Sequence, residues 1–145
     1  MFILYYIAQY AVAPVKGFDR SVIKASTDYN VKNYPSVANI VDFLRCSITY
    51  PNAAQMIHGL KSFINKINNN EIECLTGIVR IKNGFTNVLH WANANDADYC
   101  DIKLNIIYNN KDNTRAMICE LQFLVSFLLE AKKIGHKLSW CCVVC

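Results

Sequence analysis

Tyr99-Cys-Asp-Ile-Lys-Leu-Asn-Ile-Ile-Tyr108 alternates polar and apolar residues from Asp101 to Ile106. Ala116-Met-Ile-Cys-Glu-Leu-Gln122, which follows after the polar stretch Asn109–Thr114, alternates in the same way from Cys119 to Gln122. Alternation of this kind on both sides of a turn-forming stretch predicts an antiparallel β-hairpin. Successive side chains of a strand point to opposite faces. The hairpin therefore has one apolar face and one polar face, and the polar face carries the carboxylates of Asp101 and Glu120.

Two upstream segments, Leu44–Tyr50 and Thr76–Lys82, show the same alternation and predict two more strands. If the four polar faces lie on one side of one sheet, that side combines cations, acids and an amide. Its members are Arg45, Arg80, Lys82, Asp101, Lys103, Glu120 and Gln122. Several cations around one or two acids are typical of a site for a phosphorylated ligand with a divalent metal.

A solvated sheet face with cross-strand ion pairs is the alternative interpretation of the same pattern. A hairpin register that pairs Tyr108 with Arg115 places Lys103 opposite Glu120, which predicts a simple salt bridge. An exposed aromatic residue such as Trp91, in the irregular stretch Phe85–Asp98, would favour stacking on a base, whereas a Trp91 packed at the edge of the core would not.

Helical periodicity is found in three segments, and it completes the predicted fold. Gly17–Tyr29 and Ala53–Ile67 each have an apolar face, and Phe123–Ile134 is strongly apolar before the stop at Gly135. The predicted order is α, β, α, β, β, β, α. We expect an α+β fold in which helices cover one face of a mixed, largely antiparallel four-stranded sheet.

Length and composition indicate one globular domain, because 145 residues contain 53% hydrophobic and 18% charged residues. The expected organisation is an apolar segment at 1–16, a domain at 17–138 and a Cys-rich tail at 139–145. The net charge of +4 comes from scattered cations, which argues against duplex nucleic acid as a partner. The N-terminal segment is too short to span a membrane, so we expect a cytoplasmic protein.

Seven cysteines are present, and their odd number and irregular spacing argue against a disulfide framework. Cys46 and Cys119 fall on the predicted apolar strand faces, so buried free thiols are expected there. The final residues, Cys-Val-Val-Cys145, also fit the loose pattern for prenylation, which would anchor the chain to a membrane by a lipid.

Four short motifs together resemble the RelA/SpoT-type nucleotidyltransferase domain over roughly Gly17–His136. They are Ile-Val-Asp42-Phe-Leu-Arg45, Arg80-Ile-Lys-Asn-Gly84, Tyr99-Cys-Asp-Ile-Lys and Cys119-Glu-Leu-Gln122. The resemblance implies a nucleotidyltransferase-like fold and transfer of pyrophosphate from ATP to the 3′-hydroxyl of GDP or GTP, the chemistry of guanosine tetraphosphate metabolism. It also implies Mg²⁺ as cofactor, held by an Asp and a Glu.

The resemblance assigns roles to individual positions. Glu120 matches the metal and base position, and Asp42 or Asp101 is the second candidate carboxylate, although Asp42 stands three residues before Arg45 and the family's Asp five. Together with the polar-face pattern, the resemblance gives a set of predicted nucleotide-binding residues: Arg20, Lys24, Arg45, Arg80, Lys82, Tyr99, Lys103 and Gln122.

Three functions stay open from the sequence. The chain is an active nucleotide pyrophosphotransferase, a catalytically inactive relative that binds a nucleotide or a protein partner, or an interaction module with an ion-paired sheet face. An observed Lys103–Glu120 salt bridge would favour the last.

Overall fold

The computed structural model of the chain describes residues 8–27, 35, 39–85, 100–112 and 114–130. Five strands and two helices follow one another along these segments. They are β1 (Gln9–Val12), α1 (Phe18–Thr27), β2 (Leu44–Tyr50), α2 (Ala53–Asn68), β3 (Leu75–Asn83), β4 (Ile102–Asn109) and β5 (Ala116–Val125). Within these segments no helix is long and apolar enough to cross a membrane.

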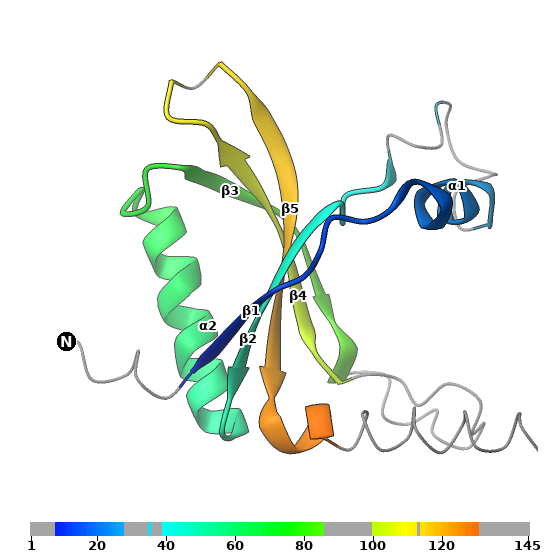
Figure 1. The fold of residues 1–145 in the computed structure, drawn as a ribbon. Helices are drawn as coiled ribbons and strands as arrows, with labels where there is room; N and C mark the ends of the chain where they lie inside the picture. Colours follow the sequence, from blue (N-terminus) through cyan, green and yellow to red (C-terminus); the bar gives the residue numbers. More distant parts are fainter. Residues whose placement is uncertain (1–7, 28–34, 36–38, 86–99, 113, 131–145) are drawn as a thin grey trace, which may run out of the picture.

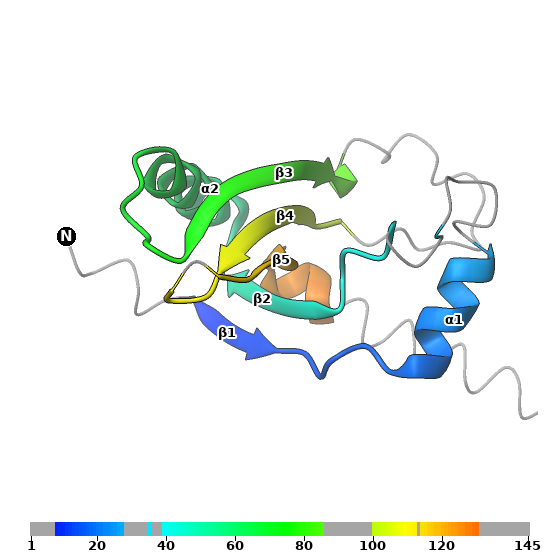
Figure 2. The ribbon, with the colours of Figure 1, turned by 90° about the horizontal axis from the view of Figure 1, so that it is seen from above.

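The strands form one sheet in the order β1-β2-β5-β4-β3, visible from above in Figure 2. Only β2 and β5 run parallel, and the other neighbours are antiparallel. The predicted α+β fold with a mixed, largely antiparallel sheet is therefore confirmed. The sheet has five strands where four were expected, because Gln9–Val12 of the apolar N-terminal segment pairs with β2 as an edge strand.

The hydrophobic core lies between α2 and one face of the sheet, and α1 lies on the other side (Figure 1). From the helix, Met56 and Ile67 are buried, and the sheet contributes the fully buried Leu104 and Phe123. The helix begins at an Asn52 cap, whose side chain accepts a hydrogen bond of 2.9 Å from the Gln55 amide. Burial of this one face leaves the polar face of the sheet on the side of α1.

The hairpin register differs from the expected one. Asn109 joins the strand, and the turn is closed by two hydrogen bonds between Asn110 and Arg115, of 3.0 and 2.9 Å. Tyr108 therefore pairs with Met117 and not with Arg115. This shift of two residues keeps every side chain on its predicted face but changes its partner.

The predicted terminal helix begins later than expected. The apolar residues from Phe123 to Val125 continue β5, because they pair with β2 and are buried in the core. Helix follows at 126–130, and the remainder of the predicted helix lies outside the described residues. A continuous apolar run fits a buried strand as well as a helix, which explains the error.

The predicted thiol burial on the apolar face is confirmed for Cys46 and Cys119. Both are free cysteines, partly buried against the core. Burial raises the pKa of both thiols above the ordinary value, so both are protonated and poorly reactive at neutral pH.

Gly59 permits the close approach of α2 to Tyr50, since a Cβ at this position would overlap the Tyr50 ring. We expect Gly59→Ala to lower the free energy of unfolding by about 1–3 kcal/mol in urea denaturation. A net loss is expected because the steric overlap outweighs the roughly 1 kcal/mol by which alanine is favoured over glycine in a helix. Gly17→Ala is the matched control, because a Cβ there meets nothing within 4 Å. Equal stability of the Gly59 variant and the wild type would contradict the packing.

Candidate functional site

Two rows of polar side chains cross the face of the sheet that α2 leaves uncovered. The members of each row stand directly opposite one another on β2, β5, β4 and β3. The first row is Arg45, Glu120, Asn105 and Arg80, and the second is Ser47, Gln122, Lys103 and Lys82. The parallel pairing of β2 with β5 places Arg45 beside Glu120, which no local sequence pattern indicates.

Glu120 is at the centre of the first row and is only 8% exposed. Its carboxylate accepts a 2.7 Å hydrogen bond from Gln122 Nε2, and within the described residues it has no ion pair. The Lys103–Glu120 salt bridge that the alternative hairpin register would give is therefore not formed. Lys103 stands opposite Gln122 and forms an ion pair of 3.3 Å with Asp101 Oδ2, two residues away on the same face.

Two buried donors flank Glu120 without hydrogen-bond partners in the described segments: Arg45 Nε on β2 and Asn105 Nδ2 on β4. The other end of the Asn105 amide is used, since its Oδ1 accepts a 2.8 Å hydrogen bond from Arg80 Nε. A buried donor left unpaired costs about 1–3 kcal/mol. An anionic ligand that accepts from both donors would therefore gain affinity.

Asp42 lies in the segment that leads into β2 and is held by two lysines. Lys16 Nζ and Lys24 Nζ approach its Oδ2 to 2.6 and 2.9 Å. Burial by itself raises the pKa of this carboxyl, but the hydrogen bonds and charges of the two lysines outweigh burial and bring the pKa below its ordinary value of 3.8. Asp42 is therefore ionised at neutral pH.

The lowered pKa of Asp42 predicts an acid-dependent loss of stability. The folded-state pKa of Asp42 lies below the ordinary value of 3.8. The stability that the ionised Asp42 contributes is therefore fully present above about pH 4, and it is lost as the pH falls through the folded-state pKa. We expect Asp42→Asn to lower the free energy of unfolding at pH 7 by about 1–3 kcal/mol, with a smaller difference at pH 3. Urea denaturation at both pH values measures this, and Asp112→Asn at the exposed hairpin is the control. A difference independent of pH would contradict it.

The donor set does not fit a divalent metal shared by the predicted carboxylates. Asp42 already binds two ammonium groups. Asp101 lies just before β4, four residues from Asn105, which pairs with Glu120. Four residues of extended chain correspond to a separation of about 13 Å. Ligands of one Mg²⁺ lie within about 4 Å of one another. Among the described residues no group of three or more His, Cys, Asp or Glu side chains could hold a metal. Mg²⁺ as a cofactor stays a prediction.

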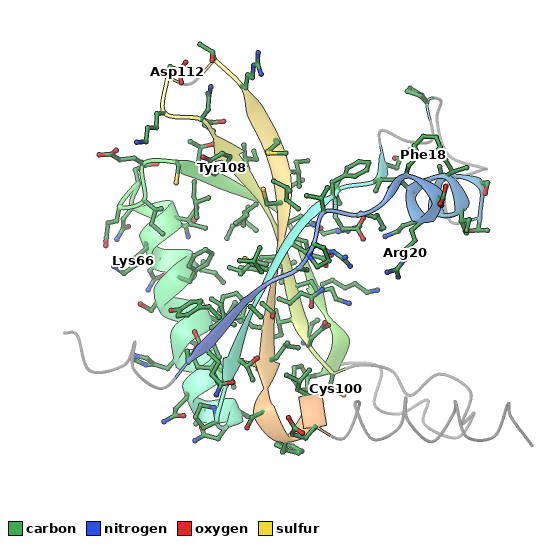
Figure 3. The ribbon with its side chains drawn as sticks, in the orientation of Figure 1. Phe18, Arg20, Lys66, Cys100, Tyr108 and Asp112 are labelled. Carbon is green, nitrogen blue, oxygen red and sulfur yellow. The ribbon has the colours of Figure 1, made fainter. Side chains whose placement is uncertain are left out.

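The structure brings most of the predicted site residues onto one face. They are Arg45, Arg80, Lys82, Lys103, Glu120 and Gln122, with Asp101 at the end of β4. Arg20 projects from α1 on the same side of the sheet, opposite to α2 (Figure 3). Lys24, also on α1, is occupied by Asp42. Tyr99 and Trp91 lie outside the described residues.

Three site residues were missed by the sequence-based assignment. Ser47 and Asn105 share the polar face by alternation, but neither was assigned a role. Lys16 lies outside the predicted helix, in the N-terminal segment, and only the folded chain shows its contact with Asp42. No local signal identifies it.

Comparison with solved structures identifies the fold. Small alarmone synthetase 1 from Bacillus subtilis, solved bound to its product pppGpp, matches with a TM-score of 0.60 and 13% sequence identity over 92% of this chain and 62% of that chain. A GTP pyrophosphokinase family protein from Streptococcus pneumoniae matches with a TM-score of 0.63 and 11% identity, over 92% and 60%. Small alarmone synthetase 2 from B. subtilis gives 0.58 and 15%, over 92% and 63%.

This chain therefore has the fold of the small alarmone synthetases, as the resemblance implied. It spans about three-fifths of the length of the solved structures it matches. No protein-family model matches it, and the comparison with curated protein sequences finds no match.

Proposed function

We propose that the polar face of the sheet binds a phosphorylated purine nucleotide, ATP or GDP/GTP. The observation that carries the proposal is the pair of buried donors on either side of Glu120, Arg45 Nε and Asn105 Nδ2, which have no hydrogen-bond partner among the residues that the structure describes. A charged donor such as the Arg45 guanidinium forms its strongest hydrogen bonds with anionic acceptors, and phosphate oxygens are acceptors of this kind.

The charges around these donors support an anionic ligand. Lys82 and Arg80 are exposed on the edge strand β3, and Lys103 stands between Gln122 and Lys82. The only carboxylate within the two rows is Glu120, so cations outnumber acids there. The pppGpp-bound relative, which has the same fold, provides independent support for a guanosine phosphate as the ligand.

Transfer of pyrophosphate from ATP to a guanosine nucleotide is the second candidate function, favoured by the position of Glu120. A buried carboxylate with no ion pair in the described residues retains its capacity to accept a proton from an attacking hydroxyl. The opposite arrangement, a carboxylate neutralised by a lysine, is found at Asp42 and not at Glu120.

Glu120→Gln separates binding from transfer. We expect the variant to bind GTP at least as tightly as the wild type, because it removes a negative charge from an anion site. If the chain is a transferase, the rate of pyrophosphate transfer falls by about 100-fold or more. Calorimetric titration of GTP and chromatography of the nucleotides after incubation with ATP measure the two effects.

Glu71→Gln, at a surface ion pair with Lys66, is the matched control. GTP binding by wild type and variant without any product would support an inactive binding domain. Absence of GTP and ATP binding to the wild type would overturn the proposal.

A further inference from the structure

One oxygen of Asp42 accepts hydrogen bonds from two ammonium groups. Lys16 Nζ at 2.6 Å and Lys24 Nζ at 2.9 Å both contact Oδ2, and these distances are typical of charge-assisted hydrogen bonds. The side chains of Lys16 and Asp42 are nearly buried, at 7% and 11% exposure, and Lys24 is 27% exposed. The group therefore carries a net charge of +1, with its one carboxylate enclosed.

The backbone holds this group against the start of β2. The Ala13 amide donates to the Arg45 carbonyl at 3.0 Å, and the Lys16 amide donates to the Phe43 carbonyl at 3.1 Å. Asp42 precedes Arg45 by three residues, so at most about 11 Å of chain separates the group from the first row of the polar face. The two lysines are therefore fixed close to Arg45, whose buried Nε has no hydrogen-bond partner in the part of the chain that the structure describes.

A divalent cation at Asp42 would have to displace the ammonium groups from Oδ2 or bind at Oδ1, which is buried and has no hydrogen-bond partner among the described residues. Displacement would leave Lys16 buried without its counter-charge, and an uncompensated buried charge is strongly unfavourable. A cation at Oδ1 would be repelled by the two ammonium groups on the neighbouring oxygen of the same carboxylate. The same carboxylate cannot both neutralise two lysines and supply the negative charge that a hard cation requires.

We propose that Asp42 is an anchor for Lys16 and Lys24, and that the fixed ammonium charges replace a metal at this end of the site. The inference rests on the proposed nucleotide binding and specifies how it is achieved. Lys16 and Lys24 supply positive charge to the phosphates, and Asp42 acts through them as a positioning residue. Binding of the nucleotide then requires no divalent cation.

The first test titrates GTP into the whole chain by calorimetry, once with MgCl₂ and once with EDTA. We expect the two dissociation constants to agree within about threefold. Binding that weakens by about 30-fold or more in EDTA would overturn the inference and leave the proposed function standing. Absence of binding in both conditions, with GTP and with ATP, would overturn the proposed function and, with it, this inference.

The second test uses Mn²⁺ alone as the probe, followed by electron paramagnetic resonance. Wild type is expected to show no site tighter than millimolar, and Lys16→Met/Lys24→Met is expected to gain Mn²⁺ affinity by about tenfold or more, because Asp42 is released. The double variant should also bind GTP about tenfold more weakly. Tight Mn²⁺ binding by the wild type that is lost in Asp42→Asn would contradict the inference.

Lys66→Met is the matched control for both readouts, because Lys66 lies on α2, away from the polar face (Figure 3), in a surface pair with Glu71. Lys16→Arg should retain GTP binding, since it preserves the charge. Circular dichroism checks that each variant is folded, and the EDTA titration of the wild type does not depend on any variant.

Discussion

Replacing Phe123 by alanine is expected to lower the free energy of unfolding by about 3–5 kcal/mol. Phe123 is fully buried in β5 and lies at the centre of an aromatic cluster. Its ring stacks on Tyr50 with centroids 6.2 Å apart and meets Phe63 at 5.9 Å in a tilted arrangement. The substitution removes these contacts and leaves a cavity between the sheet and α2, which the surrounding backbone cannot close.

Phe127→Ala is the matched control, because Phe127 is 65% exposed and follows the end of β5. We expect its stability to stay within about 0.5 kcal/mol of the wild type in urea denaturation. The pair of variants also separates strand from helix at Phe123. A helix that began at Phe123 would place both rings on one face, because the two residues are four apart. The two variants would then lose similar amounts of stability, and such a result would contradict a strand β5 that continues to Val125.

Replacing Arg45 by methionine is expected to weaken GTP binding by about 10- to 100-fold. The estimate comes from the value of a hydrogen bond to a charged group, about 1.5–3 kcal/mol. Arg45 Nε is buried and without a partner among the described residues, so the arginine already bears the cost of desolvation in the free protein. Methionine keeps much of the aliphatic length but removes the donor and the charge.

Arg115→Met tests whether this effect is specific to the site. Arg115 is exposed beside the hairpin turn, and its loss changes the net charge of the chain by the same amount. We expect GTP affinity within about twofold of the wild type, because exposed charges this far apart are largely screened. Competition with a fluorescent guanosine nucleotide measures both variants. Equal losses in the two variants would indicate non-specific attraction to a basic protein and would contradict the site.

Strand faces were predictable from the sequence because alternation is a local property. The period of two in Leu44–Tyr50 and Ala116–Gln122 fixes which side chains share a face, whatever the partner strand. Helix α2 was equally clear, since its apolar periodicity extends over several turns and Asn52 provides a cap. These features require no knowledge of distant contacts.

Strand order and register depend on contacts between distant segments. The parallel pairing of Arg45 with Glu120 joins two strands that are separated by α2, β3 and β4. In the hairpin, the hydrogen bonds of Asn110 decide that Lys103 faces Gln122 rather than Glu120. Residue types alone do not distinguish these registers, because both keep the same polar face.

The residue types on the polar face were therefore predictable, but the contacts between these residues were not. The polar alternation indicated a cationic face with a central acid, and Glu120 occupies that position. The role of Asp42 depends on Lys16, which belongs to another segment and has no motif. A carboxylate that resembles a metal ligand in sequence is bound to two lysines in the folded chain.

The most direct test of nucleotide binding on the polar face is the response of its side-chain amides to GTP in a nuclear magnetic resonance titration. We expect the Asn105 Nδ2 and Gln122 Nε2 signals to shift and to reach saturation, because both amides flank Glu120 on the face that α2 leaves uncovered. Asn68 and Asn69, at the end of α2, should not respond. Shifts confined to those exposed residues, or no shifts with GTP in excess, would contradict nucleotide binding on the polar face.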